Sequence, residues 1–303
     1  MSKELDKYFK VYDVLKKRNR WRLIAILLLL TFAVFGFKTT FSNQFTDYVA
    51  IIDLTGIIRD DHKLIAVLNK IEHNKMARAL ILRINSPGGT MVGAEGLYHS
   101  IREISDKKPV VAVMGEVATS AGYMVALAAD RIVARKTTIT GSVGVLMQSA
   151  DITNLLEKLG IKPQIVKSSE LKAQPSPFEP FSSAAREISE IVVAYVHKYF
   201  LDLVSERRKL SITDARRLSD GRIFTGGQAI EKGLVDELGG ENEARKWLDQ
   251  KKNISIQLGS RLIEYKKNQG IFSTVIRELL GKTPISNSLR LDGLISLWQP
   301  TTR

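Results

Sequence analysis

Three short segments of this chain carry residue types that together could hydrolyse an acyl bond without a histidine. Ile84–Thr90 (INSPGGT) is a glycine turn after an apolar strand, and Val117–Asp130 puts Ser120 at the start of an apolar helix. Ser168–Phe178 offers Lys172 in a loop that is broken by prolines. A hydroxyl, an uncharged amine and backbone N–H groups can act as nucleophile, base and oxyanion donors. These residues predict a serine hydrolase that cleaves peptides.

Ser120 has two interpretations at this stage. A serine at the start of a helix is usually an N-cap. The following run, AGYMVALAAD, is apolar over its first two turns, so the helix is expected to be buried and its first N–H groups to face a cavity. Ala121 and Gly122 would leave room for a substrate carbonyl. Both a cap and a nucleophile stay open.

The SPGG turn also has two interpretations. Ser86 and Pro87 end the strand, and Gly88 and Gly89 allow positive φ and the close approach of a ligand. Such a turn can aim N–H groups at a developing oxyanion. An isolated SPGG is more often a plain connection between a strand and a helix.

The base could be a histidine or a lysine. The chain has four scattered histidines: His62, His73, His99 and His197. A Ser-His-Asp triad needs one of them within reach of Ser120, and none lies between His99 and His197. A lysine is the simpler choice, because the Ser-Lys pair is a known variant and burial lowers the pKa of an amine toward the working range. Lys172, beside apolar Leu171, is the candidate.

Composition excludes several other classes of protein. There is no cysteine, so disulfides, thiolate catalysis and cysteine-based metal sites are ruled out, and no histidine pair suggests a metal. We therefore expect no metal and no cofactor. The net charge of +13 is partly concentrated in the first 22 residues, where eight basic residues face three acidic ones. The rest lacks a basic stripe with interleaved aromatics, so nucleic-acid binding is not expected.

The N-terminal region predicts a membrane anchor. Trp21–Phe37 has no charge after Arg22, and about seventeen residues is the short end of a spanning helix. A cleaved signal peptide is the alternative, but no small-x-small cleavage site follows the run. Residues 1–20 are basic and should stay cytoplasmic, with the remainder outside a bacterial-type inner membrane. We therefore expect the chain to contact the lipid bilayer through residues 21–37.

The rest of the chain predicts one α/β domain. Short apolar strands at 48–54, 77–84, 109–113 and 131–134 alternate with helices, which indicates a largely parallel sheet. Further helices are expected at 91–104, 152–159, 182–210 and 241–249. Residues 38–47 are a polar tether, 48–250 the catalytic domain, and 251–303 a C-terminal extension. Its amphipathic segments are expected to dock on the parent domain or on a neighbouring subunit, with membrane contact as the alternative.

Five segments in order resemble the signal peptide peptidase A family, in its short membrane-anchored form. They are INSPGGT, ATSAGY, TGSVGV (Thr140–Val145), SSELKAQPSPF and RIFTGGQAIEKGLVDELGG (Arg222–Gly240), and the resemblance spans residues 48–245. It implies a Clp protease/crotonase-like spiral of ββα units. It also implies a homo-oligomer with active sites near subunit interfaces, acting on apolar peptides such as remnant signal peptides.

The resemblance implies a role for each matched residue. Ser120 would be the nucleophile and Lys172 the general base, acting in its own chain or on an adjacent subunit. Gly89 would give an N–H to the oxyanion hole, together with the N–H of Ser120 or of its neighbour Ala121. Ser142 would hydrogen-bond the lysine and orient it. Ala121 departs from the family pattern, which has glycine there, and this leaves the width of the oxyanion approach open.

Two rival functions stay open. A crotonase-type enzyme acting on acyl-CoA would share the buried helix followed by ALAADRIVA, although only Glu95 supplies an acid near the SPGG turn. A catalytically inactive membrane scaffold would keep the same fold.

Overall fold

The computed structural model describes residues 46–265 and 295–297, together with Trp21, residues 24–29 and Thr31. The chain divides into two units, Met1–Asp47 and Tyr48–Arg303. In the first unit, the described residues between 21 and 31 are helical. The basic segment 1–20, the remainder of the predicted anchor and most of the tether lie outside the described residues. No helix in the described part of the chain is both long and apolar enough to cross a bilayer.

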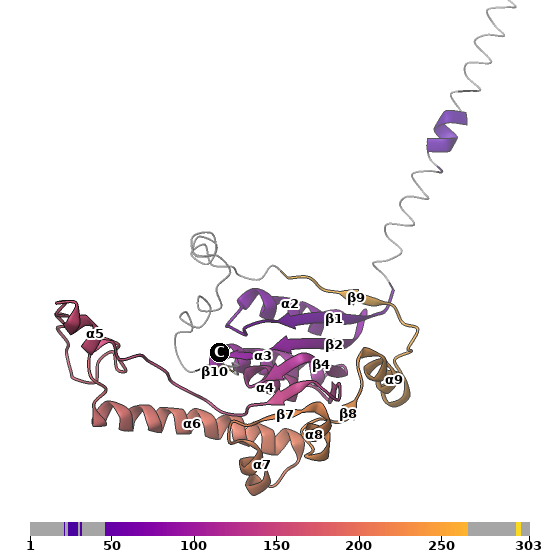
Figure 1. Ribbon diagram of the computed structural model, residues 1–303. Helices are drawn as coiled ribbons and strands as arrows, with labels where there is room; N and C mark the ends of the chain where they lie inside the picture. The colour runs from indigo at the N-terminus through magenta and orange to yellow at the C-terminus, as the bar shows by residue number, and fades with distance from the viewer. Residues whose placement is uncertain (1–20, 22–23, 30, 32–45, 266–294, 298–303) are drawn as a thin grey trace, which may run out of the picture. The chain divides into compact units, whose positions relative to one another are not determined.

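The second unit is built on a mixed β-sheet (Figure 1). Its strands follow the order β7-β6-β4-β2-β1-β9, while β5 branches from β4 and pairs in turn with β8. The strands are β1 (Tyr48–Thr55), β2 (Ala77–Ser86), β4 (Val110–Thr119), β5 (Arg131–Ala134), β6 (Ile139–Gly141), β7 (Ile223–Thr225), β8 (Glu237–Leu238) and β9 (Ser260–Leu262). Every ladder of this sheet is parallel except that between β6 and β7. The alternating sequence pattern thus predicted the α/β class and the mainly parallel pairing.

Strand β4 is longer than the sequence suggested, and it serves two ladders. Residues 111–114 pair with β5, and residues 117–119 pair with β6. The second half contains small residues with weak strand propensity, so the sequence ended this strand at Val113. Pairing with β6 supplies the backbone partners that propensity did not predict. As a result, β4 runs directly into Ser120.

Helices cover both faces of the sheet. On one face lie α2 (His62–His73), α3 (Met91–Ser105) and α4 (Ala121–Leu127), and α9 (Glu241–Lys252) packs on the other (Figure 1). Alternate strand residues enter the two cores: Ile52 and Leu82 join the first, whereas Ile51 and Ile81 join the second. Burial on both faces explains why these strands are continuous apolar runs.

A long helix extends away from the sheet. In α6 (Ser183–Arg208), Phe200 and Val204 are buried in the core near α4. The N-terminal half of α6 projects outward with the preceding loop and α5 (Thr153–Lys158), as Figure 1 shows. We call residues 147–195 the arm. The short helices α7 (Ile212–Leu218) and α8 (Gly226–Glu231) follow α6.

Part of the C-terminal extension belongs to the folded unit. Strand β9 pairs with β1, so the sheet continues past the expected boundary at residue 250. Further on, β10 (Ile295–Leu297) pairs antiparallel with β3 (Gly88–Thr90) in a separate two-stranded sheet. This docking on the parent domain is one of the arrangements that the sequence suggested for the extension.

Candidate active site

Ser120 occupies a strained turn between β4 and α4. Its φ of 58° and ψ of −123° are unusual for a residue other than glycine, and such a conformation costs about 1–3 kcal/mol. The side chain makes no capping hydrogen bond to the first turn of α4. The N-cap interpretation of this serine is therefore excluded by its geometry. A strained serine between a strand and a buried helix is the arrangement of a nucleophile elbow.

The surroundings of Ser120 are buried and hydrogen-bonded. Ser120 is 1% exposed, and its N–H donates to the carbonyl of Gly141 at 2.8 Å. Every residue of α4 is buried. The hydroxyl of Tyr123 donates to the carbonyl of Leu234 at 2.8 Å, and burial raises the pKa of this tyrosine, so the donor stays protonated. These contacts fix the start of α4 and with it the nucleophile candidate.

Ser142 is brought beside Ser120 by strand register. Thr119, the last residue of β4, pairs with Gly141, the last residue of parallel β6. The residues that follow this pair are Ser120 and Ser142. Ser142 also has a positive φ, 52°, and is 8% exposed. Its N–H donates to the carbonyl of Arg222 at 2.7 Å. The two serines predicted from separate motifs therefore lie at the same edge of the sheet.

The SPGG turn lies against the same edge. Ser86 pairs with Ala118 across β2 and β4, and Thr119 Oγ1 donates to the carbonyl of Pro87 at 3.0 Å. The N–H of Gly88 donates to Ser86 Oγ at 3.1 Å. Because α4 also contacts β3, the turn, Ser120 and Ser142 form one constellation.

Gly89 lies between two neighbouring segments. On one side, the N–H of Ile58 donates to the Gly88 carbonyl at 2.9 Å, and the N–H of Thr90 donates to the Ile58 carbonyl at 3.0 Å. Successive residues of a strand direct their N–H and C=O groups to opposite sides. The N–H of Gly89 therefore faces away from Ile58. The resemblance of the motifs implies that this N–H belongs to the oxyanion hole.

A side chain at position 89 should not fit. A Cβ atom added to Gly89 would lie 1.9 Å from the carbonyl oxygen of Ile58. We expect Gly89→Ala to displace β3, to destabilise the fold by about 1–3 kcal/mol and to abolish peptide hydrolysis. Thermal unfolding and a hydrolysis assay measure the two effects.

Gly96→Ala is the matched control for Gly89→Ala. A Cβ at Gly96, in the neighbouring helix α3, would meet Ile65 Cδ1 at 3.4 Å, an ordinary contact. Alanine there should be neutral or stabilising by up to about 1 kcal/mol, because glycine is a poor helix former. Equal losses in both variants would contradict the proposed role of the Gly89 backbone.

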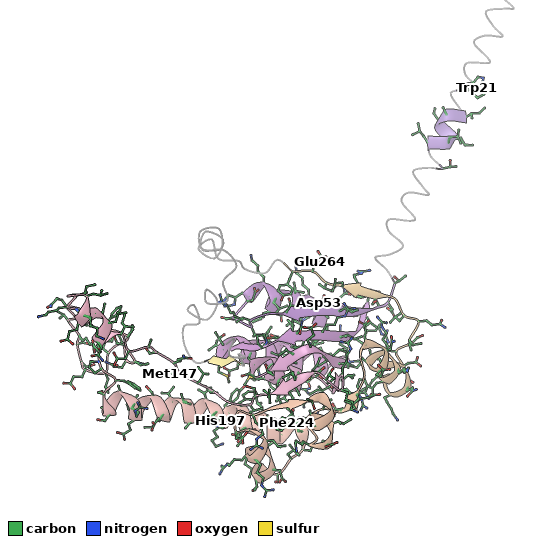
Figure 2. All side chains as sticks on the ribbon, in the orientation of Figure 1. Trp21, Asp53, Met147, His197, Phe224 and Glu264 are labelled. Atoms are coloured by element: carbon green, nitrogen blue, oxygen red, sulfur yellow. The ribbon has the colours of Figure 1, made fainter. Side chains whose placement is uncertain are left out.

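Within one chain, Lys172 lies away from Ser120. It is exposed and lies on the arm, whereas Ser120 is buried at the start of α4. In Figure 2 the chain leaves the core near Met147, and α6 returns past His197. Within the described residues, the Lys172 ammonium forms no hydrogen bond or ion pair. A single chain therefore brings Ser120, Ser142 and Gly89 to the same edge of the sheet, whereas Lys172 lies on the arm.

The loop that carries Lys172 has an ordered local structure. The Lys167 ammonium is ion-paired with the Glu179 carboxylate, and the Gln174 amide donates to the same carboxylate at 2.9 Å. The N–H of Lys172 donates to the carbonyl of Ser169 at 3.1 Å. These contacts present Lys172 outward from a defined turn.

His99 and His197, the histidines on either side of Ser120 in the sequence, make contacts with other residues. His197 Nε2 lies 2.8 Å from the carbonyl oxygen of Ser219, and His99 Nε2 lies 3.4 Å from the Tyr199 hydroxyl. The described residues contain no group of three His, Asp or Glu side chains suited to a metal ion.

Three hydroxyl groups help to position the site, and none was assigned this role from the sequence. Ser86, Thr119 and Thr140 are fully buried, and each uses its hydroxyl to hold the turn or the strands next to Ser120. Thr140 Oγ1 donates to the carbonyl of Ala118 at 2.8 Å. Their closeness to the ATSAGY and TGSVGV motifs was the available signal, because buried hydroxyls need partners.

A cavity of about 1000 Å³ is formed by the arm together with the segments next to it. It is lined by residues 144–151, by the side of α6 from Arg186 to His197, by residues 219–221, and by Pro175, Ser176, Glu179 and Phe181 from the segment that follows Lys172. Ser120, Gly89 and Lys172 do not line it. The cavity begins two residues beyond Ser142 and is bounded on another side by the segment that follows Lys172.

Comparison with known proteins defines the class. The model of peptidase family S49 matches residues 102–255, which include Ser120, Ser142 and Lys172. "Putative protease" of Methanocaldococcus jannaschii is 35% identical over 216 residues, covering 71% of this chain and 68% of that protein. "Protease 4" of Haemophilus influenzae is 31% identical over 223 residues, covering 69% and 36%. "Putative signal peptide peptidase SppA" of Enterococcus faecium is 31% identical over 208 residues, covering 68% and 60%.

The chain therefore belongs to peptidase family S49. This confirms the resemblance that the five motifs indicated, and it agrees with the mixed α/β sheet. Membership favours a peptidase over an acyl-CoA enzyme.

Proposed function

We propose that this protein is a membrane-anchored serine endopeptidase that uses Ser120 as nucleophile and Lys172 as general base. The observation that carries the proposal is the conformation of Ser120: buried, at positive φ, and not used as a helix cap. In a chain of family S49, the strained conformation of Ser120 is best explained by presentation of its hydroxyl to a substrate.

The lysine is supplied by a neighbouring copy of the chain. Support comes from the exposure of Lys172 on an arm that projects from the core, and from the apolar surface of that arm. Ile188, Ile191 and Tyr195 are 49%, 58% and 77% exposed. Apolar side chains at helical spacing that are left uncovered in one chain mark a protein interface. The assembly is therefore a homo-oligomer with its active sites near subunit interfaces.

The proposed reaction runs through an acyl-enzyme. Ser120 Oγ attacks the scissile carbonyl while Lys172 Nζ takes the hydroxyl proton, and the lysine then passes that proton to the leaving amine. The N–H groups of Gly89 and Ala121 stabilise the oxyanion. Ser142, beside Ser120, accepts a hydrogen bond from the lysine and orients it. Water then hydrolyses the ester and restores Ser120.

The substrates are apolar peptides, with remnant signal peptides as the leading candidates. The apolar run at 21–37 would hold the enzyme at an inner membrane, and the catalytic domain would lie on the extracytoplasmic side. One relative carries the name signal peptide peptidase, which supports the same substrate class.

A serine-directed phosphonate tests the proposal. We expect it to modify Ser120 alone, as located by mass spectrometry of the full chain in detergent, and to stop peptide hydrolysis in proportion to labelling. Ser100, a buried serine of α3 that donates to the Gly96 carbonyl, serves as the internal control and should stay unmodified. Hydrolysis that continues with Ser120 fully labelled would exclude this serine as the nucleophile.

A further inference from the structure

Strand β4 carries two extra residues shortly before Ser120. Ile84 of β2 pairs with Met114 of β4, and the next pair along this ladder joins Ser86 to Ala118. From one pair to the next, β2 therefore advances by two residues and β4 by four. We call residues 115–117 the bulge. A β-bulge bends its strand, and bulges next to active sites re-aim the side chains that follow them.

The bulge sets the level of Ser120 against the SPGG turn. If β4 kept its regular register past Met114, Ser86 would face Glu116, and Ser120 would lie two residues further along the sheet. At a rise of about 3.3 Å per residue, this is a displacement of about 7 Å. The Thr119 hydroxyl would then lose the Pro87 carbonyl, to which it donates at 3.0 Å. Because two is an even number, the side chains of β4 keep their faces of the sheet.

Two side chains from neighbouring segments hold the backbone of the bulge. The N–H of Val117 donates to Asn85 Oδ1 at 3.1 Å. On the other side, Thr138 Oγ1 donates to the carbonyl of Gly115 at 2.7 Å, and it accepts from the N–H of Arg135 at 3.1 Å. Thr138 belongs to the buried turn between β5 and β6, whereas Asn85 is exposed on β2.

Asn85 has a fixed base from which to hold β4. Its main chain pairs with Thr55 of β1, and its carbonyl accepts from the N–H of Gly56 at 3.0 Å. A Cβ atom added to Gly115 would lie 3.3 Å from Cβ, Cγ and Oδ1 of Asn85, so the asparagine side chain lies directly over this glycine. The side chain therefore connects β2 to the bulge at both Gly115 and Val117.

We propose that Asn85 is a positioning residue of the candidate active site, which fixes the level of Ser120 through the N–H of Val117 and the bulge. This rests on the proposed function for the identity of Ser120 as the nucleophile. The Ser120 hydroxyl and the Gly89 N–H must meet one substrate carbonyl, and a misplacement of about 1 Å can cost about a hundredfold in rate. Since Asn85 acts on the position of the attacking group, its loss should lower kcat and leave KM nearly unchanged.

Asn85→Leu and Asn85→Asp test this role in the full chain. Leucine has a similar size and no acceptor, whereas aspartate keeps an oxygen that can accept from Val117. We expect Asn85→Leu to lower kcat for an apolar reporter peptide about thirtyfold or more, with KM within about twofold of wild type. Asn85→Asp should stay within about threefold of the wild-type kcat, because the acceptor is restored.

Asn74→Leu is the matched control. Asn74 is also exposed, and its Oδ1 accepts from the N–H of Met76 at 2.9 Å, next to the first residue of β2. The substitution removes a comparable hydrogen bond, so thermal unfolding should shift about as much as in Asn85→Leu, whereas kcat should stay at the wild-type value. Equal losses of kcat in the two leucine variants would overturn the proposal, and so would an Asn85→Asp variant as inactive as Asn85→Leu.

Hydrogen exchange separates this proposal from the proposed function. The N–H of Ser120 donates to Gly141, so a released bulge should speed exchange at Val117 and Ser120 in Asn85→Leu and leave the first half of β4 unchanged. This measurement needs no hydrolysis. An inactive wild type would refute the proposed function, whereas unchanged exchange at Val117 and Ser120 would refute the positioning role of Asn85.

Discussion

Ser120→Ala is expected to lower kcat for an apolar reporter peptide by roughly a thousandfold or more. The hydroxyl is the only atom group removed, and it is the one that would form the acyl-enzyme. Because the Ser120 side chain does not cap α4, removal of the hydroxyl should leave this helix intact. Initial rates at saturating peptide, with circular dichroism for the fold, measure the two effects.

Two further variants separate chemistry from stability. Ser100→Ala removes another buried hydroxyl, one that donates to the Gly96 carbonyl, and should keep nearly full activity. Ser120→Gly should be as inactive as alanine and more stable than it by about 1 kcal/mol, because glycine tolerates positive φ. Residual activity in Ser120→Ala within tenfold of wild type would rule out a nucleophilic role.

Lys172→Ala is also expected to lose roughly a thousandfold in kcat, and mixing should then restore activity. Ser120→Ala keeps its lysine and Lys172→Ala keeps its serine. When the two inactive variants are dissociated and assembled together at equal amounts, an interface that joins an intact serine to an intact lysine forms about one time in four, so about a quarter of the wild-type rate should return. The measurement is the hydrolysis rate before and after co-assembly.

The controls for this experiment come from the same loop. Lys162→Ala removes another exposed lysine of the arm and should be without effect. Lys172→Arg keeps the positive charge and cannot release its proton, so it should be as inactive as alanine. A mixture that stays inactive although the two variants co-assemble would show that the serine and the base act within one chain.

Much of the fold could be predicted because burial on both faces leaves a clear pattern. The runs at 48–54, 77–84 and 131–134 are apolar without alternation, and each is a strand with nearly the predicted bounds. The helix predicted at 182–210 is observed at Ser183–Arg208, with Ser182 capping the N–H of Ala185. Local signals of this kind need no knowledge of the partner.

Other elements depend on partners that lie far away in the sequence. The second half of β4 is a strand because β6 pairs with it, and β7 and β8 are short strands that no local periodicity marks. The apolar residues Ile188, Ile191 and Tyr195 of α6 are at helical spacing, yet they are exposed in one chain. Periodicity marks an apolar face of a helix and does not say whether the same chain covers it.

The sequence by itself determined the class of the protein, the order of its longer strands and helices, and which residues could do chemistry, since motif spacing and apolar pattern are local properties. Only the tertiary structure decided that Ser120 is a strained, buried residue and not a cap, that strand register puts Ser142 beside it, and that Lys172 is held apart on the arm. It also decided that β10 pairs with β3. Backbone strain, register and long-range pairing arise from contacts between distant segments, and no single segment encodes them.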